Sequence, residues 1–509
     1  MSLAPRYALL GLLVSSCSGR DPSIPALDGP LLADVVFPLP DTPVPSNDSI
    51  ALWGTLGTGR ATLAVNDAKV PVERNGTFAA FVEVPPGPSP VLRFLARRGA
   101  DSVVRRVVLQ RGRGSAAAGA ASSAPEGEPK AWQRWVTMRR VPSDTADSAT
   151  QWRPIYSRWR PGGELAIPIS QGVRLLSDSR TARSIRLRLA PDVHVWIPAI
   201  DADTTAVARA SQLRAGVPTI RIDSTDVVVR ISVPERLPTT VELSAHRLLW
   251  TIYGATWPSR PAARDGDGAM VRRIVPRDSA PGRVVVDMGL AALPLGWRTE
   301  WHDGAMHLRV RRPLPRSTSL RGLMVTLDPG HPPDGTTGPS RLMEDSATLA
   351  VAQVAAAMLR ERGATVSLTR TDRRALSLEA RAAISEQSPA HLFISLHLNA
   401  PGPGRPPTAV YGTQTYWMHP NGRVLARLLL TEVARAMGHP AIGMYEGDFA
   451  VLRPAWPAAV LVEGSGIVLP NREAFLRTQA GVEAYARGIV RGIERWNAAP
   501  AARALPAIN

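Results

Sequence analysis

The chain has 509 residues, of which 44% are hydrophobic and 20% are charged. These are ordinary globular proportions, which exclude a wholly disordered or fibrous protein, and the length favours about three or four domains. The single cysteine excludes an intramolecular disulfide framework and a cysteine-based zinc finger. Beyond residue 20, no apolar run is long enough to predict a transmembrane helix.

The net charge of +17 arises from 60 basic and 43 acidic residues, and almost all of the basic residues are arginine. Such an excess often indicates a nucleic acid or an anionic surface as partner. Here the arginines are spread along the chain without a block of like charge or a recognisable nucleic-acid motif. We therefore expect no nucleic-acid partner.

Residues 1–17 have the layout of an export signal, with Arg6 ahead of a short apolar run and small residues after it. The order Val14-Ser15-Ser16-Cys17 resembles the bacterial lipoprotein box, in which the cysteine is lipidated and becomes the mature N-terminus. A plain signal with an incidental cysteine is the alternative. We favour lipidation at Cys17, because the one cysteine falls where the box requires it. This predicts an exported protein, periplasmic or on the outer surface, with a lipid anchor in a membrane.

The next segments predict a tether, a β-domain and a linker. Residues 18–46 are rich in Pro, Asp and Ser, which is typical of a tether. Residues 47–111 contain short alternating apolar runs separated by turns such as Asn75-Gly76, a pattern that predicts a β-sandwich and resembles bacterial immunoglobulin-like modules. Residues 112–130 are rich in Gly, Ala, Ser and Pro and indicate a flexible linker.

Two further β-rich domains are expected between the linker and residue 318. The first, residues 131–224, contains a segment from Arg183 to Ile197 that is compatible with a small barrel of the bacterial SH3 type. The second, residues 225–318, faintly resembles β-rich wall-targeting modules. Generic β-domains that act as spacers are an equally open interpretation of both.

From Leu323 onward the pattern changes to alternating strands and helices. Alternation of this kind predicts an α/β domain over residues 321–497, with a mostly parallel twisted sheet covered by helices, and a tail at 498–509. Such sheets hold their sites at the carboxyl ends of the strands. The expected strands are 323–327, 365–368, 392–396 and 458–462, and the expected helices are 346–362, 378–384, 424–437 and 472–496.

Four polar side chains are expected to converge at that edge of the sheet. His331 follows the first strand, His397 and Glu463 end two later strands, and Glu344 lies at the start of the first helix. Two imidazoles and a carboxylate are a standard ligand set for catalytic zinc, which lowers the pKa of bound water to ~7. A second carboxylate, not bound to metal, would pass the proton to a leaving amine.

Each residue has a simpler interpretation when it is taken alone. A histidine at a strand end is more often a hydrogen-bonded residue than a ligand, and Glu344 is compatible with a capping or solvated helix position. Glu463 on a buried strand is harder to dismiss, because an ionised carboxylate at that depth is costly unless it is paired or near a metal.

The segment 321–497 resembles the zinc-dependent N-acetylmuramoyl-L-alanine amidases of the Amidase 3 type. The matching motifs occur in the family's order and are LDPGH at 327–331, Glu344, LTRTD at 368–372, SLEARAAIS at 377–385, FISLHLNA at 393–400 and AVLVEGSGIVLPNRE at 459–473.

The resemblance implies a role for each of these site residues. His331, Glu344 and His397 would bind one Zn²⁺, Glu463 would be the catalytic base and acid, and Asn399 would line the site. The reaction would be hydrolysis of the amide between N-acetylmuramic acid and the L-alanine of the peptidoglycan stem peptide.

Two arginines match the family outside the proposed ligand set, and the sequence departs from the family pattern in two loops. Arg370 and Arg381 match the family, and we interpret both as structural. Pro332-Pro333 stand where the family often has Gly-Gly, which puts substrate contacts in more doubt than metal binding. The short Pro/Gly loop after Asn399 predicts that a blocking helix, found there in some relatives, is absent.

Three hypotheses about function follow. The first is a lipid-anchored zinc amidase that cuts peptidoglycan, whose β-domains position it on the wall or on a protein partner such as an activator. The second is a zinc peptidase that acts on another amide. The third is a catalytically impaired module that only binds the cell wall; the presence of all four chemical residues counts against it.

Overall fold

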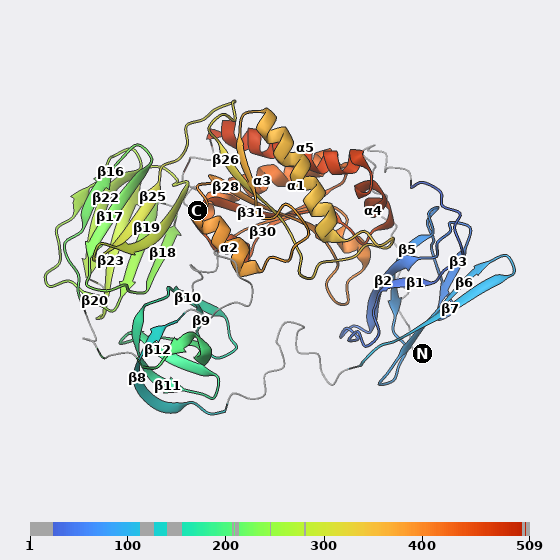
Figure 1. The fold of residues 1–509 in the computed structure, drawn as a ribbon, viewed down its shortest axis with the longest axis horizontal. Helices are drawn as coiled ribbons and strands as arrows, with labels where there is room; N and C mark the ends of the chain where they lie inside the picture. The colour runs from blue at the N-terminus through green and yellow to red at the C-terminus, as the bar shows by residue number, and fades with distance from the viewer. Residues whose placement is uncertain are drawn as a thin grey trace, which may run out of the picture.

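The computed structural model describes residues 24–111, 127–139, 155–205, 208, 213–244, 246–278, 281–500 and 504. Cys17 and the expected export signal lie outside these residues. Figure 1 shows three strand-rich units and one unit in which helices surround a sheet. Within the described residues, no helix combines the length and the apolarity needed to cross a membrane.

The N-terminal unit consists of two antiparallel sheets, ordered β1-β2-β5 and β4-β3-β6-β7. Apolar side chains from both sheets, such as Leu52 and Phe94, share one buried cluster. Its strands are β1 (Asp34–Phe37), β2 (Ser49–Thr55), β3 (Thr62–Val65), β4 (Ala68–Val70), β5 (Thr77–Glu83), β6 (Val91–Arg98) and β7 (Asp101–Val108).

The tether expected over residues 18–46 is wrong for the described part of that segment. Strand β1 pairs antiparallel with β2, and the side chains of Val36 and Val44 are buried. The proline-rich composition concealed the short apolar run Val35-Val36-Phe37, which completes a sheet instead of remaining in solvent.

The second unit is a single antiparallel sheet ordered β10-β9-β13-β12-β11-β8-β14. The segment from Arg183 to Ile197 contributes the neighbouring strands β12 and β13. The strands are β8 (Lys130–Met138), β9 (Ile155–Arg158), β10 (Leu165–Ile169), β11 (Arg174–Arg180), β12 (Ser184–Ala190), β13 (Val193–Pro198) and β14 (Ala202–Asp203), with the 3-10 helix η2 (Ala199–Asp201) before β14.

The third unit packs two antiparallel sheets, β16-β17-β25-β24 and β18-β19-β23-β22-β21, around a core that contains Trp250. Strand β16 pairs with β17, so the sheet includes residues that precede the expected boundary at 225. The strands are β15 (Leu213–Arg214), β16 (Thr219–Ile222), β17 (Asp226–Ser232), β18 (Thr239–Ser244), β19 (Arg247–Tyr253), β20 (Ala255–Thr256), β21 (Arg264–Asp265), β22 (Val271–Asp278), β23 (Arg283–Leu290), β24 (Gly296–His302) and β25 (Ala305–Arg311).

The C-terminal unit is an α/β domain, as predicted, with a six-stranded sheet ordered β27-β26-β28-β31-β29-β30. Its neighbouring strands are parallel except for β29 and β31. The elements are β26 (Met324–Pro329), α1 (Glu344–Glu361), β27 (Thr365–Leu368), α2 (Leu378–Gln387), β28 (Leu392–Asn399), η3 (Pro407–Val410), β29 (Thr413–Trp417), α3 (Pro420–Met437), β30 (Ala441–Glu446), η4 (Ala450–Leu452), β31 (Ala458–Gly466), α4 (Pro470–Leu476) and α5 (Gln479–Ala498).

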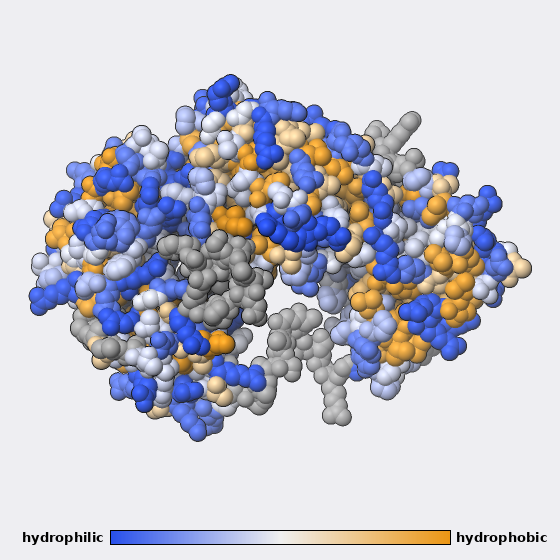
Figure 2. All heavy atoms as spheres, viewed as in Figure 1, coloured by the Kyte–Doolittle hydropathy of each residue, from blue (hydrophilic) through white to orange (hydrophobic). Residues whose placement is uncertain are grey.

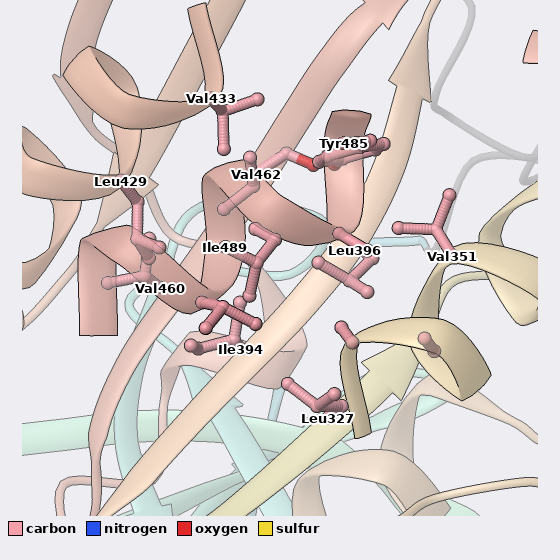
Figure 3. Close-up of a cluster of buried hydrophobic side chains, with 14 of the residues drawn as sticks. Leu327, Val351, Ile394, Leu396, Leu429, Val433, Val460, Val462, Tyr485 and Ile489 are labelled. Carbon is pink, nitrogen blue, oxygen red and sulfur yellow. The ribbon is translucent and has the colours of Figure 1, made fainter. Parts of the chain in front are cut away.

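Helices α1, α3 and α5 cover one face of this sheet, and their apolar side chains meet those of β26, β28 and β31 (Figure 3). Ile394, Val460 and Val462 lie in this core with Ile489 of α5. Residues of the opposite parity, such as Asp328 and Leu461, point to the other face, where α2 and η4 lie. The alternation of each strand therefore assigns one face to the main core, whereas the other face carries both polar residues such as Asp328 and a smaller apolar cluster that contains Phe393 and Leu461.

Two predictions for this domain are corrected. The single helix expected over 472–496 is two helices, α4 and α5. Thr478 lies between them and caps the N-terminus of α5, because its side chain accepts a hydrogen bond from Gly481 N–H at 3.0 Å. Strands β29 and β30 were not predicted at all; they extend the sheet beyond β31.

Candidate metal centre

The structure brings His331, Glu344 and His397 together at the carboxyl edge of the sheet. His331 follows β26, Glu344 is the first residue of α1, and His397 lies near the end of β28. One ligand atom from each residue lies within 4.8 Å of the other two. His331 Nε2 and His397 Nδ1 are both 3.3 Å from Glu344 Oε1. This is close to the edge of about 3.4 Å that a tetrahedral site with bonds of about 2.1 Å requires.

Hydrogen bonds orient the side chains of His331 and Glu344 toward the centre. His331 Nδ1 lies 3.2 Å from the carbonyl oxygen of Pro333, which leaves Nε2 to face the centre. Glu344 Oε2 accepts from Thr336 N–H, and Oε1 accepts from Leu398 N–H, both at 2.9 Å. Burial opposes ionisation of Glu344, but the two imidazoles outweigh it and hold the pKa of this carboxyl below its ordinary value.

Gly330 provides the space that the second histidine occupies. A Cβ atom at this position would lie 2.3 Å from the imidazole Cε1 of His397, closer than any ordinary contact. The glycine in the LDPGH motif is therefore needed for the close approach of strand and ligand.

A buried ion pair supports the loop that carries His331. Asp328 and Arg381 are 0% and 2% exposed, and Arg381 Nη1 donates to Asp328 Oδ1 at 2.6 Å. The same guanidinium donates to the carbonyl of His331 at 2.8 Å, and Arg370 donates to the carbonyl of Gly330 at 2.9 Å. Both arginines thus bind the backbone around the first ligand, which is the structural role that we had predicted for them.

Glu463 lies beside these residues, on the neighbouring strand β31, directly opposite His397 in the parallel register. Its Oε2 atom is shielded from solvent and has no hydrogen-bond partner within the described chain. Burial raises the pKa of this carboxyl to about 7, against the lowering effect of the His397 charge. A group poised near neutrality can both accept and release a proton.

Asn399, which was expected to line the site, and three other histidines of this domain lie outside the cluster of His331, Glu344 and His397. Asn399 is half-buried at the end of β28, and its carbonyl accepts from Ile467 N–H. His391 accepts a hydrogen bond from Met324 N–H at the opposite end of that strand. His419 packs against Trp297 at the start of α3, and His439 contacts the Thr413 hydroxyl. None of these histidines joins the three-residue cluster among the described residues.

Sequence reasoning missed the residues that hold the loop between His331 and Glu344. Glu473 of α4 accepts from the N–H groups of Ser340 and Leu342 at 2.8 and 2.9 Å. Trp53 of the N-terminal unit donates to the carbonyl of Thr337. Glu473 ends the motif at 459–473, which was the signal available in the sequence, whereas nothing in the sequence connects Trp53 with this loop.

Comparison with known proteins finds similarity over the same segment. Residues 325–495 match the N-acetylmuramoyl-L-alanine amidase family. The probable cell wall amidase LytH of Staphylococcus epidermidis is 26% identical over 205 residues, which are 40% of this chain and 67% of that protein. LytH of Staphylococcus aureus is 28% identical over 207 residues, 39% of this chain and 66% of that one. The chain thus spans about two thirds of the length of these relatives.

A solved structure is also similar to this segment. The catalytic domain of CwlV, an N-acetylmuramoyl-L-alanine amidase from Bacillus (Paenibacillus) polymyxa var. colistinus, is 28% identical. The match covers 34% of this chain and 97% of that one, with a TM-score of 0.32.

Proposed function

We propose that the C-terminal domain, whose residues 325–495 match the N-acetylmuramoyl-L-alanine amidase family, hydrolyses the amide between N-acetylmuramic acid and the L-alanine of the stem peptide in peptidoglycan. The observation that carries the proposal is the cluster of His331, Glu344 and His397, with Glu463 beside it. A zinc ion fits this donor set of two imidazole nitrogens and one carboxylate.

His331, Glu344 and His397 would hold the metal, and Glu463 would transfer the proton. A bound zinc ion would lower the pKa of a water molecule to ~7 and polarise the scissile carbonyl. Glu463 accepts the proton of the attacking water and donates it to the departing amine of L-alanine. Its shielded Oε2 atom and its pKa of about 7 suit both halves of this transfer.

We further propose that the protein acts outside the cytoplasm, anchored through a lipid on Cys17, and that its β-rich units place the catalytic domain on the wall. The relatives are named as cell wall amidases, which supports the location. The two-sheet N-terminal unit supports an immunoglobulin-like module, and the antiparallel sheet of the second unit is compatible with an SH3-like one.

Digestion of purified peptidoglycan by the full chain tests the proposed reaction. We expect free stem peptides with an N-terminal L-alanine, loss of this product when a chelator is added, and recovery when zinc is restored. The Glu463→Gln variant should lose turnover but keep zinc. Cleavage at a different amide would identify a zinc peptidase instead, and intact peptidoglycan in the presence of bound zinc would identify a wall-binding module.

A further inference from the structure

The strand register continues the edge of the metal centre across two more strands. His397 of β28 pairs with Glu463 of β31, Glu463 pairs with Gln414 of β29, and Gln414 pairs with Gly443 of β30. Residues opposite one another in a sheet point to the same face. The face that carries the metal ligand His397 and Glu463 therefore extends, through Gln414, to Gly443.

Three aromatic side chains lie on this extension, and we call them the aromatic ledge: Tyr416, Tyr445 and Phe449. The Tyr416 hydroxyl donates to Gln414 Oε1 at 2.8 Å, so its ring reaches toward the row of Glu463. The ring centroid of Tyr416 is 5.6 Å from that of Tyr445 and 4.9 Å from that of Phe449. A Cβ atom on Gly443 would lie 2.4 Å from the Tyr445 hydroxyl, so the Tyr445 side chain lies against Gly443, which is in the same row of the sheet as Glu463 and Gln414.

The outer two rings of the ledge are open to solvent. Tyr445 is 43% and Phe449 is 39% exposed, and they are the only exposed aromatic side chains in residues 325–495, all of which the structure describes. Figure 2 shows a surface that is mostly hydrophilic, on which exposed apolar groups are interspersed. Adjacent exposed rings beside a candidate active centre are a typical feature of a ligand-binding surface.

Charge indicates which part of a peptidoglycan substrate these rings face. The exposed residues Glu446 and Asp448 flank the ledge, and Arg453 is already paired with Asp448. Around the loop that leads to Glu344, the exposed Arg341, Arg373 and Arg477 are likewise paired, with Asp34, Asp345 and Glu473. Carboxylate-bearing stem peptide is disfavoured beside the acidic groups, whereas a neutral sugar ring is not.

We propose that the aromatic ledge is a saccharide subsite, in which a neutral N-acetylated sugar ring of the glycan strand packs on Tyr445 and Phe449 and the carboxylate-bearing stem peptide extends away from Glu446. This inference deepens the proposed function and rests on it. The apolar C–H face of a pyranose ring would cover the aromatic faces, and its polar rim would stay in contact with water. The ledge thereby distinguishes the sugar side of the scissile amide from the peptide side.

The test measures binding without turnover, in the full chain carrying Glu463→Gln. The probe is a neutral oligosaccharide of N-acetylglucosamine, which carries the N-acetylated pyranose rings without a carboxylate, titrated by calorimetry. Tyr445→Ala and Phe449→Ala should each raise its Kd about fivefold or more, and Tyr445→Leu and Phe449→Leu should do the same because they remove the flat ring but keep an apolar side chain. Trp301→Ala, which removes a 36% exposed ring from the third unit, should leave the Kd unchanged.

The outcomes separate this inference from the proposed function. Unchanged glycan affinity in all four ledge variants, with zinc content equal to that of the parent, would overturn the saccharide subsite. Weakened binding of a free L-alanine stem peptide, with unaltered glycan binding, would overturn it as well by assigning the ledge to the peptide. Failure of the wild-type chain to release stem peptides from peptidoglycan would instead overturn the amidase assignment itself.

Discussion

The indole N–H of Trp53 donates to the carbonyl oxygen of Thr337 at 2.9 Å, across 284 residues of sequence. Trp53 is 6% exposed and stacks on Phe37 of β1, with ring centroids 4.5 Å apart. Beside this contact, Nε and Nη2 of the Arg341 guanidinium donate to the carboxylate of Asp34. The N-terminal unit is therefore attached to the loop that connects the first two proposed metal ligands.

Replacing Trp53 by Phe should weaken metal binding. The preceding residue, Thr336, donates its N–H to Glu344 Oε2, so a looser loop would position this ligand less well. Phenylalanine keeps the apolar ring and removes the donor. Since a hydrogen bond contributes about 0.5–1.5 kcal/mol, we expect the Kd for zinc to rise about 2- to 12-fold. Competition with a metal indicator measures it, with Trp301→Phe as control, and a Kd equal to that of wild type would refute this coupling.

Removing Asp328 should strongly destabilise the α/β domain. Asp328→Ala leaves the guanidinium of Arg381 buried without its partner, and breaking a buried ion pair in this way costs about 3–5 kcal/mol of unfolding free energy. The exposed pair between Arg362 and Glu494 provides the control, because Glu494→Ala should cost less than about 1 kcal/mol. Urea unfolding compares the two, and similar losses would contradict the role of burial.

Adding a methyl group at residue 330 should impair the centre while the fold survives. In Gly330→Ala, the new Cβ would displace the imidazole of His397, so we expect loss of most zinc binding. Gly402→Ala is the matched control, since a Cβ there meets nothing within 4 Å. Zinc content by elemental analysis and secondary structure by circular dichroism are the measurements. Full zinc occupancy in Gly330→Ala would show that the contact is not restrictive.

Glu386 should make the stability of the protein depend on pH. Burial raises the pKa of this carboxyl, near the end of α2, to about 8. Between its ordinary pKa of about 4.5 and that value, the folded state binds a proton that the unfolded state has released, so stability falls as pH rises through this window. Glu386→Gln removes the loss. Its Tm should exceed that of wild type at pH 8.5 and approach it at pH 5, and a Tm difference that does not change with pH would contradict the prediction.

The motif at each strand end allowed the α/β domain and its four chemical residues to be predicted. His331, His397 and Glu463 follow apolar runs whose alternation with helical segments predicts buried parallel strands, and parallel strands bring their carboxyl ends to one edge. Glu344 was predicted from its position at the start of the first helix, and its backbone contacts with Thr336 and Leu398 became visible only in three dimensions.

Several other features depended on packing between distant segments. Strand β1 was concealed by prolines, and β29 is a short run, Thr-Gln-Thr-Tyr-Trp, whose polar residues find partners only through tertiary contacts such as Thr415 Oγ1 with the Ala426 carbonyl. The break between α4 and α5 interrupts a continuous amphipathic pattern, so periodicity alone joins the two helices. The contact of Trp53 with Thr337 has no local signal at all.

Anomalous diffraction at the zinc absorption edge, from crystals of the full chain grown with zinc, tests the central claim most directly. The account predicts one peak about 2.0–2.3 Å from His331 Nε2, a carboxylate oxygen of Glu344 and His397 Nδ1, with Glu463 nearby but not bound to the metal. A peak at other side chains, or no peak at these three after zinc has been supplied, would contradict it.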